Sequence, residues 1–154
     1  MARTVWVLHG PNMDLLGSRE PELYGRETLQ SIDRRLKKLG EDLGLSVECF
    51  QTNHEGALID RLTVASKAAQ GCLVNPGGLS HTSVALADTM RAMTVPVVEV
   101  HLTNLYAREA ARSVSLTGAS ATGVIMGFGA RSYELGLQEL ASRLKPSGGR
   151  RRTR

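Results

Sequence analysis

Five short apolar segments, each of the length of one β-strand, alternate along this chain with longer segments of helical periodicity. The apolar runs lie near residues 4–9, 45–50, 72–75, 97–101 and 123–127. Leucine and isoleucine recur every three or four residues between 29 and 43, and similar patterns follow Glu55, begin near 81–83 and occupy 133–144. This alternation predicts a parallel sheet covered by helices on both faces.

The length of the chain limits how these elements can be arranged. Its 154 residues suit one domain with a substantial core. Five strands in this length favour a flavodoxin-like, doubly wound α/β fold over a barrel. We predict a single domain at 1–144 and a basic tail at 145–154. The least regular segment, 102–121, is expected to be a loop with one short helix around 107–112.

The net charge of +4 comes from the tail. The last ten residues hold five of the 19 Lys and Arg and none of the 15 Asp and Glu, which leaves 14 against 15 and a charge of −1 elsewhere. A basic tail can bind nucleic acid, but a solvated end is the prediction here. The domain itself predicts no nucleic-acid partner. With no apolar run near the ~20 residues of a membrane span and no signal-peptide pattern at residues 1–4, we expect a cytoplasmic protein.

Cysteine and lysine usage restricts the chemistry. Cys49 and Cys72 fall in expected strands without CxxC spacing, so they predict neither a disulfide framework nor a zinc site. The histidines have no helical i, i+4 pair, so no metal is predicted, although ligands that converge only in space stay an alternative. The four lysines lie on expected helix surfaces and in the tail, which disfavours a Schiff-base mechanism. They are Lys37, Lys38, Lys67 and Lys145.

All four histidines follow an apolar run. His9, His54, His81 and His101 each stand where a strand is expected to give way to a loop or helix. Ligands of open α/β sheets bind at the carboxyl ends of the strands, and histidine exchanges protons near neutral pH. This placement predicts one polar site built from four loops. For His54 considered by itself, a structural hydrogen-bonding role is the favoured interpretation.

The connection at 10–25 is long for a link between a strand and a helix, where 2–6 residues are usual. Long loops of this kind are often lids. Its notable polar side chains are Arg19 and Tyr24. The alternative to a functional role is that Tyr24 packs over the end of the helix and that Arg19 is solvated. In the loop at 51–56, Asn53 is expected to cap the next helix and Glu55 suits its first turn.

The segment 75–83 resembles a phosphate cradle without the lysine or spacing of a P-loop. Gly77 and Gly78 allow close backbone approach to a ligand, and Ser80 or Thr82 is expected to cap the helix. An alternative interpretation of these loops is a flavodoxin-like module that binds a nucleotide or a flavin.

Glu99 and His101 lie two residues apart on one strand, so both side chains point to the same side of the sheet. Glu99 would orient the imidazole and favour its protonated form, which makes His101 a candidate general acid. A buried structural pair is the alternative. Leu102 and Thr103 then supply backbone N–H groups. Arg108 and Arg112, four residues apart, suit a carboxylate or hydroxyls.

Taken together, these loops resemble the type II 3-dehydroquinate dehydratases (type II dehydroquinases). The similarity covers about residues 4–144, and each motif falls in the order and spacing of that family. The motifs are Gly10-Pro11-Asn12, Arg19-Glu20-Pro21-Glu22-Leu23-Tyr24-Gly25, Asn53-His54-Glu55-Gly56, Asn75-Pro76-Gly77, His81-Thr82-Ser83, Val98-Glu99-Val100-His101, Ala107-Arg108-Glu109 and Arg112.

The resemblance implies a flavodoxin-like catalytic domain, usually assembled as a dodecamer of four trimers. It implies reversible dehydration of 3-dehydroquinate to 3-dehydroshikimate, without metal, cofactor or imine. By position, Tyr24 would remove a C2 proton, Arg19 would stabilise its anion, and His101 would protonate the leaving hydroxyl. Asn12 would hold a water that stabilises the enolate.

The resemblance also implies a substrate-binding set. Asn75, His81 and Arg112 would bind hydroxyls, and the Leu102 and Thr103 amides would bind the carboxylate. Asp88 would reach the site of a neighbouring subunit. These residues follow in chain order as Asn75, His81, Asp88, Leu102, Thr103 and Arg112.

The chain departs from the family pattern at a few positions. His9 and Asp14 stand where asparagine is common in the family, and Met13 stands where leucine is usual. Thr103 stands in place of the more usual serine, and Tyr106 occupies a position that is often histidine. Asp14 adds a negative charge near a loop that must hold a tyrosinate. The alternative is therefore a catalytically weakened relative that binds a related small polyol acid. The resemblance leaves open whether the pathway is aromatic biosynthesis or quinate breakdown.

Overall fold

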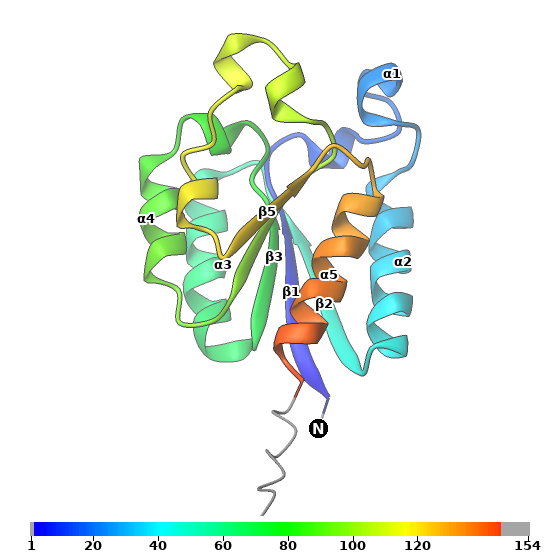
Figure 1. Cartoon of the computed structure of the whole chain (residues 1–154), viewed down its shortest axis with the longest axis vertical. Coiled ribbons are helices and arrows are strands. Elements are labelled where there is room, and N and C mark those ends of the chain that lie inside the picture. Colours follow the sequence, from blue (N-terminus) through cyan, green and yellow to red (C-terminus); the bar gives the residue numbers. More distant parts are fainter. Residues whose placement is uncertain (1, 146–154) are drawn as a thin grey trace, which may run out of the picture.

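A five-stranded parallel sheet runs through the centre of the protein, with helices on both of its faces (Figure 1). The computed structural model describes residues 2–145, so the predicted tail lies, apart from Lys145, outside the described residues. The strands are β1 (Arg3–His9), β2 (Leu45–Gln51), β3 (Gly71–Asn75), β4 (Val97–His101) and β5 (Gly123–Met126). The helices are α1 (Pro21–Tyr24), α2 (Leu29–Asp42), α3 (Glu55–Ala68), α4 (Val84–Ala92) and α5 (Arg131–Arg143).

The strand order is β2-β1-β3-β4-β5, and every neighbouring pair is parallel. This order is the flavodoxin-like one, so the predicted fold class is confirmed. The order reverses at the seam between β1 and β3, where His9 and Asn75 are register partners. Ligands of such sheets bind outside the carboxyl ends of the strands at this seam, so the topology predicts a site above His9 and Asn75.

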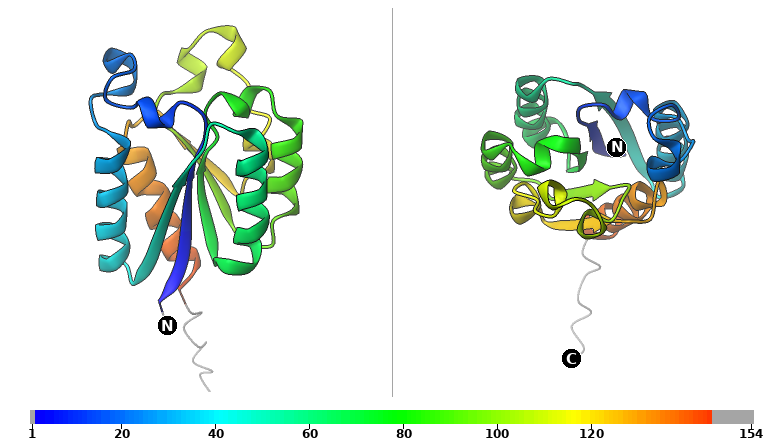
Figure 2. Two further views of the ribbon diagram at one scale, coloured as in Figure 1. Left: turned by 180° about the vertical axis from the view of Figure 1, so that it is seen from behind. Right: turned by 90° about the horizontal axis from the view of Figure 1, so that it is seen from above.

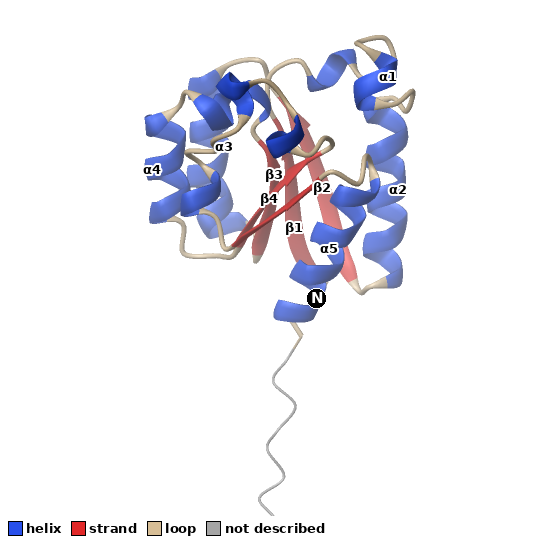
Figure 3. Cartoon of the chain, turned by 45° about the horizontal axis from the view of Figure 1, so that its top comes forward, coloured by secondary structure: helices blue, strands red, loops and turns tan. Residues whose placement is uncertain are grey.

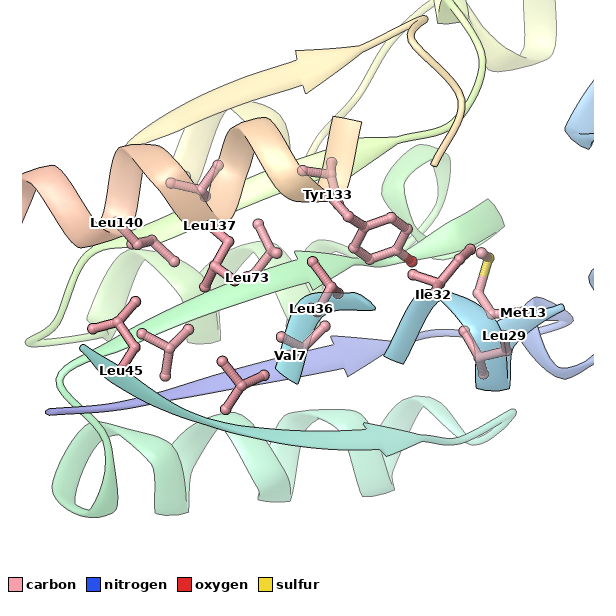
Figure 4. Packing of buried hydrophobic residues seen from close by; sticks show 14 of the residues in the cluster. Val7, Met13, Leu29, Ile32, Leu36, Leu45, Leu73, Tyr133, Leu137 and Leu140 are labelled. Atoms are coloured by element: carbon pink, nitrogen blue, oxygen red, sulfur yellow. The ribbon is translucent and has the colours of Figure 1, made fainter. Parts of the chain in front are cut away.

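Alternation along β1 divides the core into two layers. Val5 and Val7 pack with α2 and α5, whereas Trp6 and Leu8 pack with α3 and α4. Figures 2 and 3 show one helix pair on each side of the sheet, and Figure 4 shows the α2 and α5 layer from close by. The same alternation directs the side chain of His9 toward α2 and α5.

The starts of two helices differ from the predictions. Asn53 does not cap α3, because its Oδ1 accepts hydrogen bonds from the Asn12 N–H and from Gln51 instead; His54 is the N-cap residue and makes no side-chain cap. The third predicted helix begins later than expected. The 3₁₀ segment η2 (Gly77–His81) comes first, and Ser83, rather than Ser80 or Thr82, caps α4 by accepting from the Leu86 N–H at 2.9 Å.

The irregular segment before β5 also differs in detail. In place of one short helix it holds three 3₁₀ turns: η3 (Leu105–Ala107), η4 (Ala110–Arg112) and η5 (Gly118–Ser120). The first connection contains a further one, η1 (Met13–Leu15). Among the described residues, no helix combines the length and the apolar character needed to cross a bilayer.

Candidate active site

A pocket opens above the carboxyl ends of β1, β3 and β4, over the seam where the strand order reverses. The loops after these three strands supply its walls, and the loop after β1 is the segment 10–25. The predicted site residues that line it are Arg19, Tyr24, Asn75, His81, His101, Leu102, Thr103 and Arg112. A neighbouring hollow shares Tyr24, Thr103 and Arg108 with it and extends toward α2 and α5. Three of the four predicted loops therefore converge, whereas the loop at 51–56 does not line the pocket.

Tyr24, the last residue of α1, lies between two arginines. Its hydroxyl accepts a hydrogen bond of 2.9 Å from Nη1 of Arg108. The guanidinium carbon of Arg19 lies 4.7 Å from the centre of the Tyr24 ring, and that of Arg108 lies 5.3 Å from it. A cationic N–H donor favours a phenolate over a phenol. This arrangement suits Tyr24 to act as a base.

Arg108 is the partner of Tyr24 that sequence reasoning missed. The sequence predicts that Arg19 stabilises the anion and assigns Arg108 only to carboxylate or hydroxyl binding. In the structure Arg19 stacks on the ring, and Arg108 holds the oxygen. The two residues are 84 positions apart, and no local pattern signals a contact over that distance.

His101 is held from below by Glu99, as expected from their spacing. Nε2 of His101 lies 2.9 Å from Oε2 of Glu99, and both side chains are buried. The Glu99 carboxylate also accepts hydrogen bonds from the hydroxyls of Ser115 and Thr117. Because a carboxylate only accepts, Nε2 of His101 carries a proton, and the ring is oriented with its opposite side at the pocket. This geometry suits a general acid.

His81 and Arg112 also line the pocket. Nδ1 of His81 donates to the carbonyl of Val114 at 2.7 Å, which fixes the ring and leaves Nε2 near Ser80. Nε of Arg112 donates to Glu109 at 2.6 Å. The pKa of the Glu109 carboxyl is lowered, first by a hydrogen bond from its own backbone N–H and then by Arg112. Arg112 thus keeps its remaining N–H donors for the pocket.

Three of the predicted site residues do not line the pocket. Glu99 lies beneath it, in contact with His101. Asn12 is exposed beside it in a left-handed conformation, with φ of 67°. Asp88 lies away from it on the exposed side of α4, where it accepts from Arg91 at 2.8 Å. Asp14 is exposed on η1 and does not line the pocket.

The prediction of a single site for all four histidines is wrong for two of them. His54 is exposed at the start of α3. His9 is fully buried below the pocket, where Nε2 lies 2.7 Å from Asp33 and Nδ1 lies 2.8 Å from the Tyr133 hydroxyl. Alternation places His9 on the α2 and α5 side of the sheet, whereas Glu99 and His101 point to the other side.

One group of potential metal ligands converges among the described residues. The donor atoms of His9, Asp33 and Cys49 lie within 4.8 Å of one another. Burial, with a smaller effect of Asp33, raises the pKa of the Cys49 thiol to about 12. A neutral thiol is a poor metal ligand, and His9 already engages both ring nitrogens. The cluster therefore fits a metal ion poorly.

The segment that carries Tyr24 is buried only in its first part. Met13 and Leu16 are buried in the α2 and α5 core layer, whereas no residue from 17 to 28 is buried. At its start, a Cβ on Gly10 would lie 2.6 Å from the carbonyl oxygen of Pro76. This close approach joins the loops that follow β1 and β3.

Comparison with known proteins identifies the family. The model of the family described as "Dehydroquinase class II" matches residues 3–141. The chain belongs to this family. The match covers nearly every element of the dehydroquinase fold, from β1 into α5.

Individual relatives agree with the dehydroquinase family match. A protein from Ruegeria pomeroyi named 3-dehydroquinate dehydratase is 48% identical over 96% of this chain and 99% of its own. One of the same name from Desulforudis audaxviator is 51% identical, over 93% and 97%. The crystal structure of type II dehydroquinase from Propionibacterium acnes superposes with a TM-score of 0.89 at 39% identity, covering 92% of this chain and 98% of that one.

Proposed function

We propose that this protein is a hydro-lyase that interconverts 3-dehydroquinate and 3-dehydroshikimate. The observation that carries the proposal is the placement of Tyr24, with Arg108 on its hydroxyl and Arg19 on its ring, in the same pocket as the His101–Glu99 pair. Relatives that are named for this activity and match nearly the whole chain support it.

The proposed reaction uses two protein groups in turn. Tyr24 takes a proton from C2, and the electron pair of that C–H bond forms an enolate with the neighbouring ketone. The enolate then collapses to form the C=C bond as the C–O bond of the departing hydroxyl breaks. His101 gives that oxygen a proton, so water leaves. Asn12, exposed at the edge of the pocket, would hold a water that stabilises the enolate.

Other residues would orient the substrate. Asn75, His81 and Arg112 line the pocket as polar groups suited to hydroxyls, and Leu102 and Thr103 line it near Arg108, where their backbone amides would bind the carboxylate. The proposed steps use no cofactor, metal or imine. Sodium borohydride added with the substrate should therefore not inactivate the protein, because the reagent fixes a substrate to a side chain only by reducing an imine between them.

We further propose that the protein forms a homo-oligomer, with a dodecamer of four trimers as the expected assembly. An open hollow of about 610 Å³ between β5 and α5 supports self-association, since β5 is a sheet edge and two apolar side chains are exposed there, Val124 on β5 and Phe128 just after it. Asp88, which is remote from the pocket of its own chain, would then reach the site of a neighbour. Light scattering on the purified protein tests the assembly.

The proposed setting is the cytoplasm, in the shikimate pathway of aromatic amino acid biosynthesis or in quinate breakdown. The dehydration step is common to both pathways. A complementation experiment tests the biosynthetic role. A strain that lacks its own dehydroquinase is grown on medium free of aromatic amino acids, with and without this gene.

A steady-state assay with 3-dehydroquinate tests the activity directly. The product is a conjugated enone, so turnover appears as a rise in ultraviolet absorbance. We expect saturable turnover that is strongly reduced in Tyr24→Phe. Calorimetric binding of 3-dehydroquinate without any absorbance change would contradict the hydro-lyase assignment and indicate a binding protein on the same fold.

A further inference from the structure

A chain of hydrogen bonds, partly buried at Asp33 and fully buried beyond it, runs under the pocket from α2 to β3. Oδ1 of Asp33 lies 2.7 Å from Nε2 of His9, and Nδ1 of His9 lies 2.8 Å from the Tyr133 hydroxyl. That hydroxyl lies 3.0 Å from Nδ2 of Asn75. Figure 4 shows Tyr133 projecting from the start of α5 into the core layer, with its oxygen directed away from Leu137 and Leu140. Only the last member, Asn75, lines the pocket.

The first member sets the direction of every bond in this chain. The Asp33 carboxylate only accepts, so Nε2 of His9 must carry the proton and Nδ1 of a neutral ring must accept. Nδ1 therefore receives the O–H of Tyr133. The Tyr133 oxygen then has only lone pairs left for Asn75, so it faces the N–H₂ group of that amide and not its carbonyl oxygen.

The amide of Asn75 is held on its other sides as well. Its Oδ1 accepts from the Gly77 N–H at 3.1 Å, and Nδ2 lies 3.4 Å from the sulfur of Met13. A rotation of the amide by 180° would place N–H₂ against the Gly77 donor and a carbonyl oxygen against the Tyr133 oxygen. At Gly77 two donors would then meet in every case, and at Tyr133 two acceptors would meet unless the chain behind it reversed.

We propose that His9 and Asp33 are positioning residues for Asn75. Through Tyr133 they hold the Asn75 amide in one of its two orientations, so that the pocket presents a fixed pattern of donor and acceptor to a substrate hydroxyl. The assignment rests on the proposed function, because Asn75 is taken there as a substrate ligand. The proposed reaction uses neither His9 nor His54, and of these two only His9 is buried.

The surroundings of His9 fit this role better than proton exchange. His9, Tyr133 and Asn75 are all buried. Burial raises the pKa of the Tyr133 hydroxyl, which therefore stays protonated and serves as a donor. The Cys49 thiol beside Asp33 is also kept neutral, so it brings no competing charge.

Nitrogen NMR tests the direction of the chain without any substrate. In protein labelled with ¹⁵N at histidine, we expect His9 near neutral pH to be a neutral ring protonated at Nε2, with Nδ1 showing the shift of an unprotonated nitrogen. Asp33→Asn, which can donate as well as accept, should weaken that preference. A wild-type ring that is protonated at Nδ1 would overturn the proposal, since Tyr133 would then face a donor.

Kinetics test the effect on the pocket. Tyr133→Phe removes one oxygen and should raise KM about five- to tenfold, the equivalent of one neutral hydrogen bond, with kcat changed less than about twofold. In the Tyr133→Phe background, Asp33→Asn should have no further effect on KM, because the two act through one chain. Independent effects of the two substitutions would overturn the proposal.

Two further variants separate the possible failures. Leu137→Val, one turn along α5, perturbs the same core without touching the chain, so its KM should stay normal; a rise equal to that of Tyr133→Phe would mean general loosening and overturn the proposal. If Asn75→Ala leaves KM unchanged, its role as a substrate ligand in the proposed function fails instead. Unchanged KM in Tyr133→Phe alongside a raised KM in Asn75→Ala overturns the positioning role alone.

Discussion

The hydroxyl of Tyr24 accepts its hydrogen bond from Arg108, not from Arg19, although Arg19 lies five residues away on the same connection. Arg108 comes from the segment between β4 and β5, so the proposed base is completed by a residue from outside its own loop. The Arg108 side chain also lies 3.4 Å from the hydroxyl of Thr103. One guanidinium therefore links the proposed base to the wall that carries His101.

Arg108→Ala should lower kcat by about 10²- to 10³-fold, as the loss of one preorganised donor to a developing anion commonly does. Arg108→Lys should recover part of this, because the charge remains while the fixed geometry of the guanidinium is lost. Steady-state kinetics measure both. In a Tyr24→Phe background, Arg108→Ala should cost nothing more in kcat, and a full additional loss there would contradict the link between the two residues.

Tyr24→Phe and His101→Ala should each lower kcat much more than they weaken substrate binding. General acid–base groups typically contribute about 10²- to 10⁴-fold, and neither substitution removes a group that the proposal assigns to holding the substrate. Steady-state kinetics give kcat for each variant, and calorimetry gives its affinity for 3-dehydroquinate, so the two effects can be compared. Turnover near that of the wild type in either variant would remove that residue from its assigned step.

Glu99→Gln should lower kcat by roughly 10- to 100-fold, part of the contribution of a general acid, while KM changes little. The carboxylate accepts from His101, Ser115 and Thr117, and a carboxamide of the same shape cannot accept at both ends. Glu48→Gln, on the exposed side of β2, is the matched control and should behave as wild type. Equal kinetics for the two variants would count against Glu99 as the residue that orients His101.

The fold should lose stability in alkali through its buried thiols. Burial raises the pKa of Cys72 from an ordinary value of 9.0 to about 12. The folded state therefore keeps the thiol neutral while the unfolded chain ionises, so this stabilisation is complete below pH 9 and lost as the pH rises toward 12. The shift corresponds to about 4 kcal/mol. Urea unfolding of wild type and Cys72→Ala between pH 7 and 11 should give a flatter curve for the variant; parallel curves would contradict the assignment.

Gly10→Ala should destabilise the protein by about 1–3 kcal/mol, because the new methyl group meets the backbone of Pro76 and the loops after β1 and β3 must move apart. Gly56→Ala is the control, since a Cβ there meets no atom within 4 Å and alanine is a better helix former than glycine in the first turn of α3. Thermal unfolding should place the two variants on opposite sides of wild type. A neutral Gly10→Ala would mean that the two loops are not in contact.

The strands and most helices could be predicted because their periodicity is local. All five strands were placed to within one or two residues, and α2 begins at Leu29 as its leucine spacing indicates. The starts of helices are harder to predict, because several neighbouring polar residues can each serve as the cap. The sequence predicts Ser80 or Thr82 as the cap of α4, and in the structure the cap is Ser83. Side-chain competition of this kind is decided by tertiary contacts, such as the bond from Ser83 to Glu55.

Contacts between site residues could be predicted where both residues lie on one strand, and less well where they come from different loops. Glu99 and His101 share a face by the two-residue period of a strand, and the structure pairs them. The same period sends His9 to the opposite layer from His101, which its position at a strand end did not reveal. The pairing of Tyr24 with Arg108 depends on how two loops meet, and nothing in the residues near either one indicates it.

The attachment of the first connection has a consequence for engineering. Its anchors, Met13 and Leu16, precede Gly17, and from there to Thr28 no side chain is buried, although Tyr24 packs against the core layer. The stretch that carries Arg19 and Tyr24 can therefore be exchanged with that of another family member as a cassette, at little cost in folding. Chimaeras of this kind would show how much of the catalytic rate belongs to the cassette and how much to the sheet beneath it.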